Sequence, residues 1–334
     1  MKRISSFLIL LALGLSACGQ PHASNPTPVV GNPSAATQPP LSTPVVDYAA
    51  AARGYVKALT DIGPRPAGTE AESATAKYIA DALNGMGYSA ETQPFIANDA
   101  SGNPVSSANV VAVKGGKSAQ EIIVGAHYDS VEVGKGADDN ASGVAVMLEV
   151  ANQIKNESTP FTIRFIAFGA EETGLLGSYA YVNKMSQTDF ENTIAMINLD
   201  SLIAGDITYV YSAEPQAALR DWTLEWAFGN SLDLQTIHDA DLTTGSGSGV
   251  SDFFPFQQAG IPFIYFEATN WNLGGLDGYT QVGPQYGQQG KIWHTPDDTL
   301  EYLDATFPGR VDQHLSMFVQ ILKGILTQYE GPTP

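Results

Sequence analysis

Acidic residues and histidines stand in this sequence at points where an apolar, strand-like run gives way to a loop. They occur in His127-Tyr128-Asp129, Asp138-Asp139-Asn140, Glu171-Glu172, Asn198-Leu199-Asp200 and His294. Imidazole nitrogens and carboxylate oxygens are the ligands that a zinc-type cation selects in proteins. Buried carboxylates this close together would repel one another unless a cation lay between them. The series therefore predicts a hydrolase that uses two metal ions.

The first candidates follow a buried strand over residues 122–126. His127 stands at the end of that strand, and Asp129 is two residues further on, so both side chains can face the same way. An aspartate in this position can fix the tautomer of a metal-bound histidine. A purely structural His–Asp pair explains these two residues equally well.

The segment Gly136 to Gly143 opens a helix, where acidic residues often serve only as caps. A carboxylate at this point can equally bridge two cations, with one oxygen on each metal. Glu171 and Glu172 follow a fully apolar strand, and the chain re-enters the core directly after them. One glutamate can therefore bind metal while the other acts on water, although a solvated acidic turn is the alternative.

Helices alternate with short apolar strands along the chain, which predicts an α/β fold. We expect a three-layer sandwich with a central, mostly parallel mixed sheet flanked by helices. In such sheets, functional groups collect at the carboxyl ends of the strands, where the candidates fall. The expected helices cover residues 48–61, 70–87, 142–154, 174–184, 215–229 and 307–329, and the expected strands cover 109–113, 121–126, 161–168, 193–198, 207–211 and 261–266.

The amino-terminal residues 1–17 have the pattern of an export signal. Lys2 and Arg3 precede an apolar run that is too short to span a bilayer as a mature helix. The run ends in Leu15-Ser16-Ala17-Cys18, which resembles the lipobox of bacterial lipoproteins. We therefore expect a lipoprotein signal peptide over 1–17 and an exported protein anchored to the cell-envelope membrane by a lipid on Cys18. An ordinary secretory signal is the alternative.

Residues 18–45 are rich in Pro, Ser, Thr and Ala, and predict an extended tether rather than a folded segment. His22 in this tether is not expected to be a ligand. Residues 46–330 show no second shift of this kind and predict one folded domain. Cys18 is the only cysteine, so the domain has no internal disulfide. The formal net charge of -19 argues against nucleic acid as a partner.

The ordered motifs resemble those of the M28 family of zinc aminopeptidases, and the resemblance covers most of the chain after Val45. Its strongest parts are Ala126-His127-Tyr128-Asp129-Ser130, Gly136 to Gly143, Glu171 to Ser178, Asn198-Leu199-Asp200 and His294-Thr295-Pro296. The resemblance implies two Zn²⁺ per chain. It implies that one zinc is held by His127 and Asp200, the other by Glu172 and His294, and that Asp139 bridges both. Asp138 does not align with the bridging residue.

The resemblance also implies roles for residues that do not bind metal. Glu171 would be the general base, and Asp129 would orient His127. Asp252 matches a family aspartate expected behind the distal histidine, His294. Many relatives have a histidine directly after that aspartate, whereas this chain has Phe253, and this departure weakens the assignment of Asp252.

The implied function is that of an aminopeptidase, which hydrolyses the first bond of peptides with a free amino terminus through a metal-activated water. A glutaminyl cyclase, which is an acyl-transferring relative, and a catalytically inactive surface-binding module are the alternatives. Cyclases typically depart from the pattern kept in residues 138–143, and an inactive module need not retain the full ligand set. We expect 266–275 to form a substrate wall, with an ordinary surface loop as the alternative, and His238 and His314 to be structural.

Overall fold

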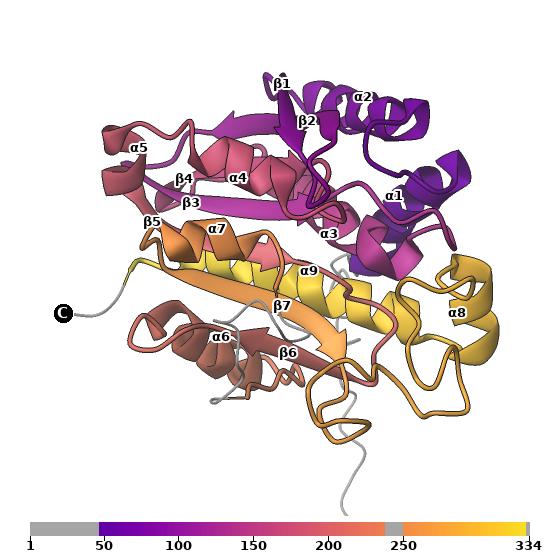
Figure 1. The fold of residues 1–334 in the computed structure, drawn as a ribbon. Coiled ribbons are helices and arrows are strands. Elements are labelled where there is room, and N and C mark those ends of the chain that lie inside the picture. Colours follow the sequence, from indigo (N-terminus) through magenta and orange to yellow (C-terminus); the bar gives the residue numbers. More distant parts are fainter. Residues whose placement is uncertain (1–46, 238–249, 332–334) are drawn as a thin grey trace, which may run out of the picture. The chain divides into compact units, whose positions relative to one another are not determined.

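The computed structural model describes residues 47–237 and 250–331 of the chain (Figure 1). The predicted signal peptide, Cys18, His22 and the tether over 18–45 lie outside the described residues, and so does His238. Among the residues described, no helix combines the length and the apolar character needed to cross a membrane.

The middle layer is one seven-stranded sheet with the order β1-β2-β4-β3-β5-β7-β6. Strands β4, β3, β5 and β7 pair in parallel, whereas β1, β2 and β6 are attached antiparallel at the two edges. The sheet is thus parallel where it is most buried, and the predicted α/β sandwich is confirmed. The strands are β1 (Glu91–Asn98), β2 (Pro104–Lys114), β3 (Ser118–His127), β4 (Phe161–Phe168), β5 (Thr193–Leu199), β6 (Ile207–Tyr211) and β7 (Phe263–Thr269).

Helices cover both faces of this sheet (Figure 1). One face packs against α1, α2, α3 and α9, and the other against α4 and α7. In β3, Ile122 and Val124 belong to the first core and Ile123 to the second, which explains the unbroken apolar run. The helices are α1 (Tyr48–Ile62), α2 (Glu70–Gly85), α3 (Ser142–Ile154), α4 (Leu176–Val182), α5 (Gln187–Asn192), α6 (Ala218–Gly229), α7 (Phe253–Gln258), α8 (Leu300–Thr306) and α9 (Arg310–Gln328).

Local signals fix where several of these helices begin. The Asp47 carboxylate accepts the backbone amides of Ala49 and Ala50 and caps α1, and Thr69 caps α2 in the same way. Before α3, the backbone of Ala137–Ala141 makes an irregular turn, in which Asp139 has non-helical angles. Asp139 therefore lies outside the regular helix, and its side chain does not have to follow the helix surface.

The structure differs from the sequence prediction mainly in short or edge elements. Neither β1 nor the short helices α5, α7 and α8 were predicted, because an exposed edge strand and one- to two-turn helices carry little periodic signal. The helix expected over 307–329 begins only at Arg310, after Gly309 in the left-handed region. The strand expected over 261–266 runs instead from Phe263 to Thr269, because β6 pairs with it as far as Thr269.

Candidate metal centre

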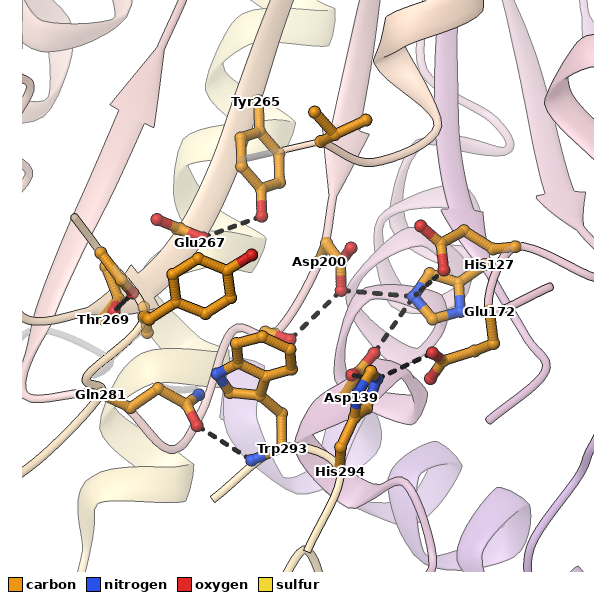
Figure 2. Close-up of a pocket in the computed structure, with 16 residues that line it drawn as sticks. His127, Asp139, Glu172, Asp200, Tyr265, Glu267, Thr269, Gln281, Trp293 and His294 are labelled. Carbon is orange, nitrogen blue, oxygen red and sulfur yellow. Dashed lines mark hydrogen bonds and ion pairs between the residues drawn. The ribbon is translucent and has the colours of Figure 1, made fainter. Parts of the chain in front are cut away.

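The structure brings the predicted ligands together at one end of the sheet (Figure 2). His127 is the last residue of β3, and Asp200 directly follows β5, its parallel neighbour. Glu171 and Glu172 lie in the turn after β4, the other neighbour of β3. Parallel strands end at the same edge, so strand order alone places these groups side by side. Asp139 enters from the turn before α3, and His294 from the loop before α8.

Two groups of ligand atoms share one aspartate. Nε2 of His127 lies 3.2 Å from Oδ1 of Asp139 and 3.4 Å from Oδ1 of Asp200. Nε2 of His294 lies 3.1 Å from Oδ2 of Asp139 and 2.7 Å from Oε2 of Glu172. Each group has its donor atoms within 4.8 Å of one another, which suits a single metal ion. The two oxygens of Asp139 thus face two separate groups, as a bridging carboxylate requires.

The donor atoms and their electrostatics fit two divalent cations. Nitrogen and carboxylate oxygen donors are typical of zinc. Burial and nearby carboxylates raise the pKa of Glu172 to about 7, and that of Glu171 well above its usual value. Burial opposes the charge on Asp139 also, but the two histidine rings lower its pKa. Oε1 of Glu172 is buried without a hydrogen-bond partner in the described part of the chain. Cations between these groups would relieve the repulsion and use that free oxygen.

The backbone is strained around this cluster. Ala170, Ser201 and His294 are non-glycine residues with positive φ values of 56°, 51° and 57°. Ala170 precedes the glutamate pair, and Ser201 follows Asp200. Such conformations cost free energy and persist where surrounding contacts enforce them, commonly at functional sites. The strained positions are thus His294 itself and the neighbours of Glu171 and Asp200, whose side chains point into the candidate metal site.

Asp129 has a broader structural role than the sequence suggested. Its carboxylate oxygens accept the backbone amides of Glu171 and Glu172 at 3.0 and 3.2 Å, so it holds the glutamate turn. Nδ1 of His127 is 3.6 Å from the Asp129 carboxylate and 3.2 Å from the Asp129 carbonyl oxygen. Asp129 is thus placed to orient the histidine and the two glutamates together, which residue spacing alone could not indicate.

Asp138 points away from the centre and supports its scaffold. It accepts the amides of Ile203 and Ala204 and the side-chain amide of Gln281. The carboxylate of Asp298 accepts the backbone amides of Asp138 and Asp139 at 2.6 and 3.2 Å, so it anchors the bridging residue. Nothing in the sequence pattern around Asp298 signals this role, because the two amides it accepts lie about 160 residues earlier in the chain.

Arg65 is a further supporting residue that sequence reasoning missed. Its fully buried guanidinium donates to the carbonyl oxygens of Tyr128, Lys135 and Gly136. It therefore joins the segment after His127 to the loop that leads into Asp139. Nothing in the local sequence signals this contact, because its partners are backbone atoms far along the chain.

The expectation that Asp252 lies behind His294 is not met. Among the described residues, no hydrogen bond or ion pair joins these two side chains, and the charges that act on Asp252 come from His127, Asp129 and Asp200. Asp252 directly precedes α7, which packs against β5 and β7 and so brings Asp252 to the His127 side. Its neighbour Ser251 donates to Oδ2 of Asp200 at 2.7 Å and is the residue that supports a ligand here.

A cavity opens beside the metal ligands, and part of the expected substrate wall lines it. Glu267, Ala268 and Thr269 contribute from β7, together with Tyr279 and Trp293 from the loops that follow. Trp271 lies behind this wall, where its indole nitrogen donates to the hydroxyl of Tyr211. His314 does not line the cavity; it is buried in α9, and burial lowers its pKa to about 4.

The fold and this site fit a metal-dependent enzyme of the α/β type. Residues 109–319 match the model of peptidase family M28. The chain is 35% identical, over 77% of its length and 84% of the relative, to "Alkaline phosphatase isozyme conversion protein" of Escherichia coli (strain K12). It is 33% identical, over 59% of its length but only 40% of the relative, to "Aminopeptidase YwaD" of Bacillus subtilis (strain 168).

Solved structures agree with the fold. A zinc aminopeptidase from Bacillus subtilis superposes with a TM-score of 0.67 at 21% identity, covering 84% of this chain and 96% of that one. A glutaminyl cyclase from Tannerella forsythia superposes with a TM-score of 0.64 at 20% identity, covering 84% and 98%. The chain belongs to peptidase family M28. The predicted family and the predicted class of enzyme, a metal-dependent peptidase, are confirmed.

Proposed function

We propose that this chain is a di-zinc aminopeptidase. The observation that carries the proposal is Asp139, whose two oxygens face two separate groups of ligand atoms. His127 and Asp200 would hold one zinc, and Glu172 and His294 the other. Bound there, two zinc ions would supply Lewis acidity that polarises the scissile carbonyl and makes water more acidic. Membership of family M28 supports peptides as the substrates.

Glu171 is the residue we assign to proton transfer. Its carboxylate lines the cavity and approaches Nε2 of His127 to 3.9 Å, but it belongs to neither group of ligand atoms. Burial and neighbouring acids raise its pKa, which suits a base that must also release its proton. Glu171 would take a proton from the attacking water and pass it to the amine that leaves. Asp129 would keep Glu171 aimed through the backbone amide that it accepts.

The test is hydrolysis of aminoacyl-p-nitroanilides and their N-acetylated counterparts, with metal content measured on the same sample. We expect cleavage of the free-amine substrates only, loss of activity on chelation and recovery with zinc. Inactivity with two zinc ions bound would point to a cyclase or another acyl transfer. Inactivity without metal would point to a binding module. The complete set of ligands supports the peptidase over both alternatives.

We also propose that the chain is exported and held at a membrane by a lipid on Cys18, with residues 18–45 as a tether and 46–330 as the catalytic domain. The signal-like pattern over 1–17 supports this. One relative, 31% identical over 60% of this chain and 42% of its own length, is named "Probable lipoprotein aminopeptidase LpqL" from Mycobacterium tuberculosis. Labelling with a clickable fatty acid in cells, compared with Cys18→Ser, would test the anchor. Label retained in the variant would contradict it.

A further inference from the structure

Glu267 is a buried acid in the cavity that the proposed metal sites do not use. It lies on β7, one residue after the pairing of Phe266 with Leu199 of β5. Tyr265, Glu267 and Thr269 share one face of that strand, and all three line the cavity. Figure 2 shows Tyr265 and Glu267 on one side of the space and His127 and Glu172 on the other, with Asp200 between them.

Two tyrosines hold the Glu267 carboxylate in place. The Tyr211 hydroxyl donates to Oε1 at 2.7 Å, and the Tyr265 hydroxyl donates to Oε2 at 2.8 Å. The indole nitrogen of Trp271 in turn donates to the Tyr211 hydroxyl at 2.7 Å. A carboxylate has about four acceptor sites, so these two bonds orient the group without using its full capacity. Glu267 is thus a fixed acceptor with room for another donor.

No cation of the described chain forms an ion pair with this acid. Burial, together with the nearby charges of Asp200 and Asp138, raises the pKa of Glu267 to about 7. A buried carboxylate without a cationic partner is costly, and a bound cation would remove that cost. A positive group from outside the described residues would therefore complete this site.

The metal sites leave the charge of Glu267 uncompensated. Asp139, Glu171, Glu172 and Asp200 carry four negative charges when ionised, which two divalent cations would balance. Glu267 is the further acid that lines the cavity. With both cations bound, the residues that line the cavity would therefore keep one net negative charge when ionised, on Glu267; Lys291, whose charge acts on Asp139 and Glu172, is not one of the lining residues.

The other polar groups on this wall already have partners. Gln281 donates to Asp138 and accepts the backbone amides of Ile292 and Trp293. Thr269 donates to the carbonyl oxygen of Gly278. These side chains have little capacity left for a polar substrate group, and Glu267 has the most.

Aromatic rings form the surroundings of this acid. Tyr265, Tyr279 and Trp293 line the cavity, and the rings of Tyr279 and Trp293 stack with centroids 5.5 Å apart. Because the Trp293 ring also has Nζ of Lys291 3.8 Å from its centroid, Tyr265 and Tyr279 are the rings left to a substrate side chain. Aromatic faces pack well against the methylene stem of lysine or arginine, and against a guanidinium group. A leucine side chain would fill such a space but would leave the acid without a cation.

We infer that this cavity receives the cationic side chain of an amino-terminal arginine or lysine, and that Glu267 is the residue that selects it. This inference rests on the proposed aminopeptidase function. The α-amine of the substrate is the other possible cation. Only one carbon separates that amine from the scissile carbonyl, so it must stay beside the metal ligands, whereas Glu267 stands across the cavity from His127 and Glu172.

The test compares Arg-, Lys-, Leu- and norleucine-p-nitroanilide with the zinc-loaded full chain and with Glu267→Gln. Glutamine keeps the shape of glutamate and can still bond to both tyrosine hydroxyls. We expect kcat/KM for Arg and Lys to fall about 10- to 150-fold in the variant, which is the loss of one charge-assisted bond of about 1.5 to 3 kcal/mol at 1.4 kcal/mol per factor of ten. The Leu and norleucine values should change less than about threefold. The matched control is Glu149→Gln, which alters a buried glutamate of α3 outside the cavity.

Calorimetric binding of argininamide and norleucinamide provides a readout without turnover. We expect zinc-loaded wild-type protein to bind argininamide more tightly, and Glu267→Gln to lose that difference. An equal loss for all four substrates would assign Glu267 to the α-amine and overturn the inference. Absence of any preference for Arg or Lys in wild-type protein, in turnover or binding, would overturn it as well. Preferential argininamide binding without hydrolysis of any substrate would instead refute the proposed peptidase function alone.

Discussion

The substitution Asp129→Asn tests whether one carboxylate holds the proposed centre together. Asp129 is fully buried and accepts two backbone amides, from Glu171 at 3.0 Å and from Glu172 at 3.2 Å. Asparagine keeps one acceptor oxygen, and its NH₂ group would face the second amide donor. One charge-assisted bond worth about 1.5 to 3 kcal/mol is lost, and a buried donor is left unsatisfied at about 1 to 3 kcal/mol. Partial relaxation of the surrounding structure offsets some of this loss. We therefore expect the free energy of unfolding to fall by about 3 kcal/mol.

The assay is urea unfolding of the metal-free chain, so that zinc binding does not mask the change. A domain of ordinary stability, about 5 to 15 kcal/mol, would still fold after this loss. Zinc binding should also weaken about 10- to 100-fold, because the turn that carries Glu172 is released. Asp99→Asn is the matched control: Asp99 also accepts two backbone amides, from Ser101 and Asn103, but in an exposed turn. Equal effects of the two substitutions on unfolding would refute the reasoning.

Three further predictions concern separate parts of the molecule. Glu171→Gln should lower kcat about 10²- to 10⁴-fold while zinc content stays at the wild-type level, and near-normal turnover would remove Glu171 from the mechanism. Asp298→Ala should weaken zinc binding about 10- to 100-fold in competition with a chelator, because the backbone of the bridging Asp139 loses its anchor; an unchanged affinity would contradict this. Burial lowers the pKa of His314 to about 4, so the unfolded chain binds a proton below about pH 6.5 that the folded chain does not. The contribution of His314 to the free energy of unfolding of the metal-free chain should therefore fall by up to about 3 kcal/mol between pH 6.5 and 4, whereas buried acids with a raised pKa, such as Glu172 and Glu267, contribute in the opposite direction. Urea titrations at pH 7 and 5 should show His314→Gln gaining stability relative to wild-type protein at the lower pH, and an unchanged difference would contradict this.

The sequence determined the type of fold and the candidate ligands because both depend on local patterns. Unbroken apolar runs followed by His127, Glu171 or Asp200 indicate buried strands with functional groups at their carboxyl ends. The structure gathers His127 and Asp200, together with Asp139, Glu172 and His294, into two adjoining groups of ligand atoms, and it places Glu171 beside them. Edge and short elements such as β1 and α7 were missed because their residues are exposed or too few to show a period.

Only the tertiary structure decided how the ligands are supported and what surrounds them. Arg65, Asp298 and Ser251 act on backbone or side-chain atoms far along the chain, and no spacing rule predicts such contacts. Asp252 was assigned to the wrong histidine for the same reason, since the packing of α7 sets its neighbours. From the sequence, Glu267 is only one residue of the substrate wall expected over 266–275. Its burial, its two tyrosine donors and its place across from His127 depend on which strands pair and how their faces pack, and only the folded chain defines these.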